Sequence, residues 1–332
     1  MRLFTRHPGR RVMAERIAGL DPVADAATVY RLTAFFELPF EMRYGFNLAL
    51  YRTFAIPGIA AVLARSGQIT GAPAKRLADT GLFTYELIEA GGFDTPTARE
   101  IVRGLNRVHR GWGISNDQFL YVLATFVVVP ARWVDRFGWR RLTEAERTAM
   151  AAFYRELGRR MGITDLPDSY PAFERLLDEY EAEHLAPSPA GSELMRATAA
   201  FVNDRLPQPV KRLGPVLTRA VLDDELARGL GLRPAPAAAR IAVHRLMWLR
   251  GFVVRRMAPR SSSWFVPGTR ARSVYPNGRD HARFPGTPDG VAPRGRVSPA
   301  GGAGRRWRRL RCGRRRRAWP SRWRRARLPS SR

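Results

Sequence analysis

Cysteine and lysine are almost absent from this chain of 332 residues. The one cysteine, Cys312, cannot form a disulfide within the chain, which excludes a fold held by internal disulfides. Lysine occurs only as Lys75 and Lys211 among 57 basic residues, a usage expected of a GC-rich coding sequence. The sequence has only five histidines, and no cysteine and histidine spacing approaches a zinc site.

Long uninterrupted apolar runs are also missing. The two best candidates, residues 46–64 and 119–134, are broken at Pro57 and Pro130, whereas a membrane span needs about 20 apolar residues. We expect both runs to be buried core helices. Residues 1–11 are basic without the apolar stretch of a secretory signal. The expected location is therefore cytoplasmic, with at most peripheral contact with a membrane.

The sequence lacks strand periodicity and internal repeats, and it contains instead residues typical of helix starts and ends. Asp21-Pro22 and Thr95-Pro96 each combine an N-cap residue with proline at the first helical position. Residues 143–146 form a capping-box pattern. The sequence predicts an all-α fold with a single helical domain over residues 1–258. The expected helices cover residues 22–37, 40–64, 72–90, 96–111, 115–137, 143–162, 169–185, 191–205, 209–230 and 235–253.

The segment 259–332 differs sharply in composition from the rest of the chain. It holds 21 arginines against two aspartates, with abundant glycine, proline and serine. Aliphatic residues are too scarce there to bury a core, so we expect a disordered basic tail. From about Arg279 the composition equally fits an out-of-frame reading of GC-rich DNA.

One candidate functional residue is His109, near the end of the helix expected over residues 96–111. At 100° per residue it borders an apolar stripe. A neutral imidazole beside an apolar pocket can be an axial ligand of haem iron. An ordinary core histidine with a hydrogen-bond partner explains the same pattern, so periodicity leaves both interpretations open. The stripe consists of Ile101, Leu105, Val108 and Trp112.

A second candidate is the polar cluster of Arg76, Asp79 and Thr80 on the preceding predicted helix. Arg76 lies one helical turn from both other residues, so the three share a face. The guanidinium can bind a haem propionate, with the carboxylate and the hydroxyl beside the sixth iron position. A solvated ion pair within one helix explains the same spacing.

Other chemical motifs are incomplete. Residues 181–184 contain a Glu-x-x-His unit, but a di-iron helix bundle needs a second copy, which the sequence lacks. Residues 229–231 are not followed by a phosphate-binding or dinucleotide fingerprint, and no Gly-x-Ser-x-Gly elbow occurs. Hydrolase and dinucleotide-binding functions therefore have no support.

A series of short stretches follows one order between about residues 9 and 278. These are residues 20–22, 51–57, 75–80, 106–109, 114–117, 121–128, 139–140, 158–163 and 275–278. Together they resemble the MpaB-type and latex-clearing-protein (rubber oxygenase) family. The likeness is specific because many positions agree in order, although no single motif is diagnostic.

The resemblance implies a distantly globin-like all-α core that holds haem b. In the latex-clearing proteins one histidine is the proximal iron ligand and an Arg-x-x-Lys-Thr unit lies on the other side. Here His109 and residues 76–80 stand at the matching places, with His109 and Arg76 as cofactor-binding residues and Asp79 and Thr80 as catalytic ones. Asp79 replaces the family's lysine, which implies a sixth iron position that is open or holds water.

The implied reaction uses dioxygen to oxidise or cleave a carbon–carbon double bond of an apolar, isoprenoid-like substrate. Two functions of other classes stay open. The tail, with Trp307, Trp319 and Trp323 among its arginines, can neutralise phosphates and stack on bases, which favours nucleic-acid binding. A non-catalytic helical module is the other alternative. Non-specific contact of the tail with nucleic acid or an anionic membrane is compatible with each function.

Overall fold

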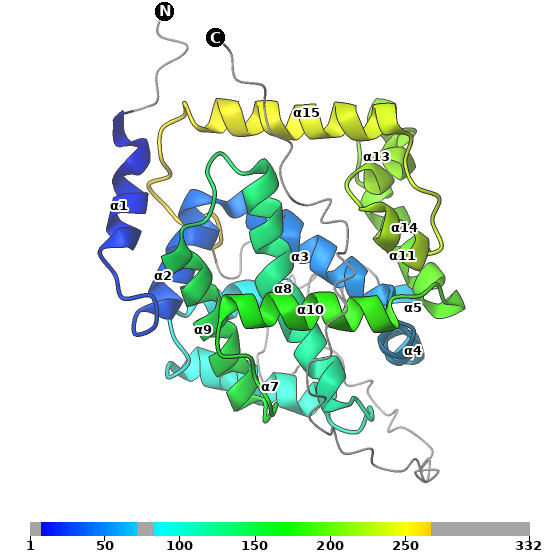
Figure 1. Ribbon diagram of the computed structural model, residues 1–332, viewed down its shortest axis with the longest axis horizontal. Helices are drawn as coiled ribbons and strands as arrows, with labels where there is room; N and C mark the ends of the chain where they lie inside the picture. Colours follow the sequence, from blue (N-terminus) through cyan, green and yellow to red (C-terminus); the bar gives the residue numbers. More distant parts are fainter. Residues whose placement is uncertain (1–7, 72–80, 82, 267–332) are drawn as a thin grey trace, which may run out of the picture. The chain divides into compact units, whose positions relative to one another are not determined.

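A computed structural model describes residues 8–71, 81 and 83–266 of the chain. The chain divides into two compact units, residues 1–293 and 294–332, and every described residue belongs to the first. All regular elements in the described ranges are helical, without a strand (Figure 1). The predicted all-α class is confirmed, while the likeness to globins stays a prediction.

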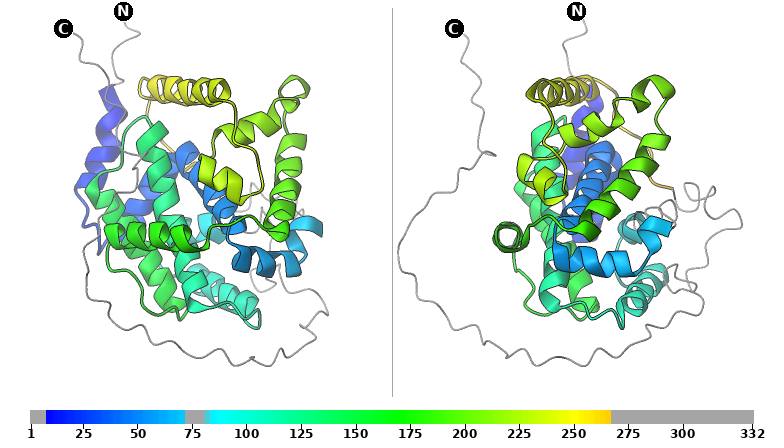
Figure 2. Two further views of the ribbon diagram at one scale, coloured as in Figure 1. Left: turned by 45° about the vertical axis from the view of Figure 1, so that its right-hand side comes forward. Right: turned by 90° about the vertical axis from the view of Figure 1, so that its right-hand side faces the viewer.

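The helices of the first unit are labelled in Figure 1, and residues 83–89 are helical as well. Their bounds are η2 (Pro8–Arg11), α1 (Val12–Ala18), α2 (Ala26–Leu32), the π-helix η3 (Thr33–Glu37), α3 (Pro39–Phe54), α4 (Pro57–Arg65), α5 (Gln68–Gly71), α7 (Pro96–His109), α8 (Asn116–Phe137), α9 (Glu144–Arg160), α10 (Tyr170–His184), α11 (Pro189–Asp204), α12 (Gln208–Lys211), α13 (Gly214–Ala220), α14 (Asp224–Gly229) and α15 (Ala237–Val254). Along the vertical direction of Figures 1 and 2, α15 and α7 lie at opposite ends.

Two predicted helix starts are confirmed in atomic detail. The Thr95 hydroxyl accepts a hydrogen bond from the Ala98 N–H at the start of α7. Thr143 and Glu146 form a reciprocal capping box at the start of α9. Ser115 caps α8 in the same way. These side chains satisfy backbone N–H groups that the first helical turn leaves without partners, which is why the local sequence predicts them.

Three predicted helices differ from the structure. The Asp21 carboxylate accepts from the N–H groups of Val23 and Ala24, so it closes a turn, and α2 begins only at Ala26. The run expected over 40–64 is two helices, α3 and α4, with a bend of 96° between them. The run expected over 209–230 is three short helices, because proline and the cap residue Asp223 interrupt it.

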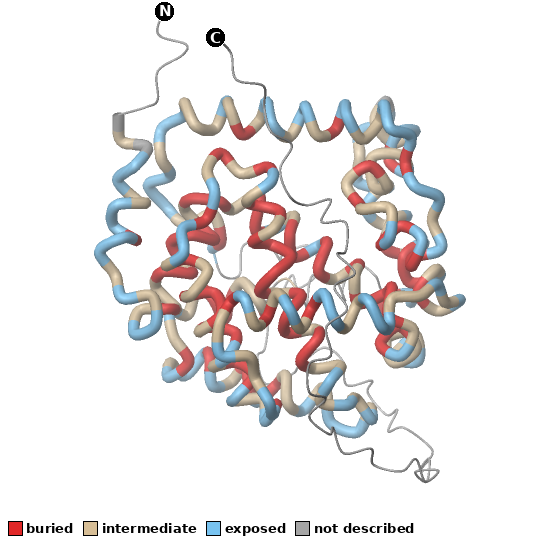
Figure 3. The backbone as a smooth tube through the Cα atoms, in the orientation of Figure 1, coloured by how far each residue is buried: buried red, intermediate tan, exposed pale blue. Residues whose placement is uncertain are grey.

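The core is organised around α3 and α8. Figure 3 shows buried residues concentrated along both helices. By length and composition α8 could cross a membrane, and so could α3 and α4 taken as one broken span. Yet 67% of the apolar window of α8 is buried inside the protein. The prediction that residues 119–134 form a buried core helix is therefore confirmed.

The two helices cross where Gly45 of α3 meets Pro130 of α8. A Cβ atom on Gly45 would lie 2.3 Å from the Cα of Pro130, well inside van der Waals contact. Only glycine therefore allows the backbones to approach this closely. The crossing holds together α3 and α8, the two described helices that carry the most buried residues.

A buried ion cluster joins η3, α9 and the loop before α9. Arg140 donates to the Glu37 carboxylate at 2.9 Å and to the Glu146 carboxylate at 2.7 Å, and the Thr33 hydroxyl donates to Glu146. Burial raises the pKa of a carboxyl, but Arg140 outweighs this effect and holds the pKa of Glu146 below its ordinary value. These contacts fix η3 to the start of α9 and the loop before it, which lie more than 100 residues further along the chain.

The core extends beyond the tail boundary expected at residue 258. Phe265 is buried, with its ring centroid 5.7 Å from that of Phe35. The backbone N–H of Trp264 donates to the Phe35 carbonyl at 3.0 Å. Residues up to Phe265 thus belong to the packed unit, and residues 267–332 lie outside the described chain.

We predict that Gly45→Ala lowers the free energy of unfolding by about 1–3 kcal/mol, because the added methyl group overpacks the crossing. Alanine is the better helix former by about 1 kcal/mol, so any loss reports the steric clash. Gly19→Ala is the control, since a Cβ there would contact only the Arg16 carbonyl oxygen, at 3.7 Å, and the Glu15 carbonyl oxygen, at 3.9 Å. Thermal denaturation followed by circular dichroism measures both. Equal stability of the two variants would contradict the crossing.

Candidate active site

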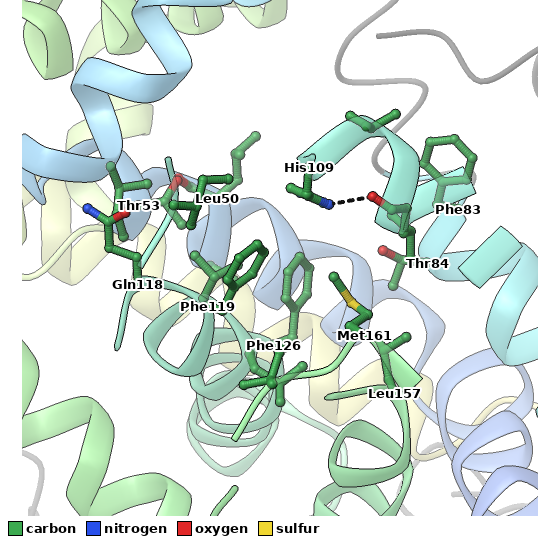
Figure 4. Close-up of a pocket in the computed structure, with 18 of the residues that line it drawn as sticks. Leu50, Thr53, Phe83, Thr84, His109, Gln118, Phe119, Phe126, Leu157 and Met161 are labelled. Atoms are coloured by element: carbon green, nitrogen blue, oxygen red, sulfur yellow. Dashed lines mark hydrogen bonds between the residues drawn. The ribbon is translucent and has the colours of Figure 1, made fainter. Parts of the chain in front are cut away.

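An apolar cavity of about 250 Å³ lies where α3, α4, α7, α8 and α9 meet (Figure 4). Aromatic and aliphatic side chains supply most of its wall, and no charged residue occurs among its described lining residues apart from the titratable His109. On α3 the lining residues Ala49 and Thr53 follow Gly45 at successive helical turns. On α8 Phe126 precedes Pro130 by one turn. The same helix faces that meet at the crossing therefore continue into the cavity.

His109 lines this cavity from the last turn of α7. The predicted orientation of that helix is confirmed, because Ile101 is buried while Arg103, Arg107 and Arg110 are exposed. The imidazole is half-buried and meets the Phe119 ring edge-on, with the ring centroids 5.5 Å apart. The helix thus presents its one histidine to an apolar space and its arginines to the surface.

One hydrogen bond sets the proton position on the His109 ring. Nδ1 lies 2.8 Å from the Leu105 carbonyl oxygen, one turn back along α7 (Figure 4). A carbonyl oxygen can only accept, so Nδ1 carries the proton. In the neutral ring the lone pair is then on Nε2. Histidines that ligate metals commonly donate their other ring N–H to a backbone carbonyl in this way.

The other polar lining groups are less suited to bind iron. The Thr53 hydroxyl donates to the Leu50 carbonyl at 2.7 Å, and Gln118 belongs to the cap of α8. The Tyr154 hydroxyl lies 3.1 Å from that of Tyr30. Burial raises the pKa of Tyr154 far above its ordinary value, so the phenol stays protonated. Among the described lining residues, the His109 imidazole is the best donor.

The residues present fit a haem group. Haem needs apolar surroundings for the macrocycle and a nitrogen donor for the iron, and the lining supplies apolar side chains and the His109 imidazole. A metal ion held by protein side chains alone needs several ligands together. Within the described ranges no group of three or more histidine, cysteine, aspartate or glutamate residues could hold such an ion. The apolar lining and the His109 imidazole are compatible with a porphyrin-bound iron.

Arg76, Asp79 and Thr80 lie outside the described residues. The described chain enters the stretch 72–80 from α5, and it continues beyond residue 82 in the helical segment 83–89. Gln68 in α5 and Phe83 after the stretch both line the cavity. The three predicted residues thus belong to a segment whose two neighbours in sequence contribute to the wall, while their own roles stay predictions.

The α3 wall is held in place by Arg52, a residue whose role the sequence did not reveal. Its guanidinium bonds the Glu181 carboxylate of α10 at 2.5 Å and the Asp223 carboxylate before α14 at 2.6 Å. Burial lowers the pKa of an arginine, but the two carboxylates outweigh it and raise the pKa of Arg52. An arginine inside an apolar run indicates that a buried carboxylate neutralises it, but the spacing of residues does not identify that carboxylate.

The same contacts explain the Glu-x-x-His unit at residues 181–184. Glu181 faces Arg52 and also accepts from the Tyr121 hydroxyl at 3.0 Å. His184 lies at the exposed end of α10, where its Nδ1 bonds the Tyr180 carbonyl at 3.1 Å. The two side chains therefore serve different contacts.

Comparison with protein families assigns the region that contains this cavity to a known family. Residues 39–252 match the family described as ER-bound oxygenase mpaB/B'/rubber oxygenase, catalytic domain. The chain belongs to this family. The resemblance seen in the sequence is therefore confirmed, and the matched region contains His109, the cavity walls and the Arg52 contacts. An oxygenase family supports an oxidoreductase that uses dioxygen and a small-molecule substrate.

Curated relatives in fungi agree with this assignment. The ER-bound oxygenase mpaB' of Penicillium brevicompactum is 30% identical over 257 residues, which are 71% of this chain and 60% of that protein. The ER-bound oxygenase mpaB of the same organism is 27% identical over 311 residues, 80% of this chain and 77% of that protein. The ER-bound oxygenase mpaB of Penicillium roqueforti (strain FM164) is 28% identical over 227 residues, 62% of this chain and 75% of that protein.

We predict that Arg52→Met destabilises the protein by roughly 3 kcal/mol, because the substitution leaves two largely buried carboxylates without their cation. Arg52→Lys keeps the charge but cannot bond both carboxylates in the same geometry, so its loss should be smaller. Chemical denaturation of the two variants measures the difference. Wild-type stability of Arg52→Met would show that the contacts do not hold the α3 wall.

Proposed function

We propose that this chain is a haem-dependent oxygenase that uses dioxygen to oxidise or cleave a carbon–carbon double bond of an apolar, isoprenoid-like substrate. The observation that carries the proposal is the position of His109, which lines an apolar cavity with its Nδ1 proton directed to the Leu105 carbonyl. Membership of the oxygenase family supports the reaction class.

His109 would hold the iron of haem b through Nε2. The Leu105 carbonyl keeps the ring in the required tautomer and makes the ligand more basic. The Phe119 ring restricts rotation of the imidazole from the other side. When bound, the haem supplies the iron at which dioxygen is activated.

The cavity wall would select and orient the substrate. Its described lining has neither a carboxylate nor a guanidinium, so nothing there would bind a charged substrate group. Phe119, Phe126 and Leu157 exclude water and offer contact area to an apolar chain. Holding the double bond in one position converts binding energy into a higher rate. The wall thus supports an apolar substrate without identifying it.

Asp79 and Thr80 would act on the reacting groups at the haem, and Arg76 would bind a propionate. Support comes from the neighbouring sequence, because Phe83, which follows this cluster closely, lines the cavity. The described lining residues include no carboxylate, and Asp79 lies close enough in the sequence to Phe83 to supply one. There it would accept a proton or hydrogen-bond the reacting group.

The cytoplasmic location and the contacts of the basic tail stay predictions. The curated relatives carry the words ER-bound in their names. Binding of nucleic acid or an anionic membrane by the tail concerns residues 267–332, which lie outside the described chain. A steep fall of such binding with salt is the property to measure.

His109→Ala should fold as a helical protein and lose stoichiometric haem, because the axial nitrogen is removed. His184→Ala is a matched control, since His184 also ends a helix and bonds the carbonyl four residues back, but is exposed and outside the cavity. The Soret band and a pyridine haemochrome assay measure haem in both variants. Full haem content with an unchanged spectrum in His109→Ala would refute the assignment.

Asp79→Ala and Thr80→Ala should retain haem and lose oxygen-dependent turnover, by roughly a hundredfold if Asp79 transfers a proton. Arg76→Ala should weaken haem retention as well, because the propionate loses its cation. Turnover under dioxygen and the rate of haem transfer to apomyoglobin separate the two effects. Wild-type behaviour of all three variants would reduce the cluster to an ion pair within a helix.

A further inference from the structure

The outward face of α15 is an apolar surface that no other described helix covers. α15 lies at the edge of the unit, with the remaining described helices on one side of it (Figures 1 and 2). Its 18 residues make a helix about 27 Å long. Only Val243 and Gly251 of this helix are buried, as the mostly pale tube in Figure 3 shows. Nine of its 18 residues are exposed, so about half of the helix faces away from the core.

The exposed side chains of α15 are large and apolar. Trp248 exposes 66% of its surface, and at least 48% of each of its apolar neighbours is exposed. At 100° per residue these positions cover about half of the helix circumference. Helices on the surface of a globular protein normally turn polar residues to that side. The exposed apolar set is Ile241, Leu246, Trp248, Leu249, Val253 and, just after the helix, Met257.

The charge around this face has one sign. No aspartate or glutamate occurs between Glu225 and Asp280. Arg245 is exposed within the apolar face. Arg250 and Arg255 instead point to the core side, where they bond the Glu41 carboxylate and the Trp139 carbonyl. Arg240 attaches to the unit as well, through the Asp224 carboxylate, so Arg245 is the cation that remains on the outer apolar face.

We propose that the outer face of α15 docks on an anionic lipid membrane, with the helix lying in the plane of the interface. An apolar face with Trp248 and the exposed Arg245 suits this position, because the indole ring enters the headgroup boundary while the guanidinium reaches the phosphates. A second copy of the chain is a poor occupant, since self-contact would bring like charges together without an acidic residue to offset them.

The docking face is separate from the haem cavity. α7, which carries His109, lies at the opposite end of the unit from α15 (Figures 1 and 2). None of the exposed apolar residues of α15 lines the cavity. The proposal therefore concerns where the protein is held, and it does not depend on the proposed oxygenase activity.

The test measures co-sedimentation of the full chain with vesicles of phosphatidylcholine and phosphatidylserine, and with vesicles of phosphatidylcholine alone. The variant carries Trp248→Ser and Leu249→Ser. The control is Val23→Ser, because Val23 is 64% exposed but lies between Asp21 and Asp25. The basic tail is identical in all three proteins, so differences between them report α15. Circular dichroism checks that each protein is folded.

The proposal predicts that the double variant binds the anionic vesicles about tenfold more weakly or worse, while Val23→Ser binds like the wild type. Equal binding by the double variant would overturn it and assign the affinity to the tail. A dimer in sedimentation velocity that the double variant dissociates, with vesicle binding unchanged, would overturn it in favour of a second copy.

A second measurement does not depend on the folding of the double variant. Trp248→Phe keeps the apolar face and should still bind. Brominated phosphatidylcholine in the anionic vesicles quenches tryptophan fluorescence on contact, so this variant should lose the part of the quenching that Trp248 contributes. Quenching equal to that of the wild type would show that Trp248 does not enter the membrane and would overturn the proposal.

Discussion

The contact of Gly45 with Pro130 is the constraint on which the rest of the site depends. It brings α3 and α8 together at backbone distance, and the lining residues on both helices lie at helical turns counted from it. A wider crossing would move Thr53 and Phe126 apart and change the shape of the cavity between them. Because packed helices behave as rigid bodies, the lack of a side chain at Gly45 also affects the size of the cavity further along α3 and α8.

Within the cavity, the orientation and the tautomer of His109 depend on a second constraint, which is local to α7. The apolar stripe of α7 directs His109 inward, and the Leu105 carbonyl assigns the proton to Nδ1. Neither feature needs a distant residue, since both follow from helical periodicity. The Arg52 contacts with α10 and α14 then hold the opposite wall by joining segments far apart in the sequence. Local helical order directs His109 into the cavity, and long-range ion pairs hold the cavity walls in place.

The features that the sequence predicts are the local ones, and the features that it misses depend on long-range contacts. The caps at Thr95 and Thr143 and the inward face of α7 could be predicted, because each depends on residues within a few positions. The 96° bend between α3 and α4 could not, since Pro57 interrupts the run without showing whether the helix kinks or ends there. The partners of Arg52 and the burial of Phe265 also depend on tertiary contacts that no spacing encodes. The exposure of α15 likewise appears only when its neighbours are placed.

The central claim is that the apolar cavity beside His109 holds haem. The most direct measurement is the haem content of the wild-type protein, purified from cells supplied with a haem precursor, by absorption spectrum and pyridine haemochrome assay. The account predicts a Soret band and stoichiometric haem b. A folded but colourless protein that also fails to take up added haem would contradict it.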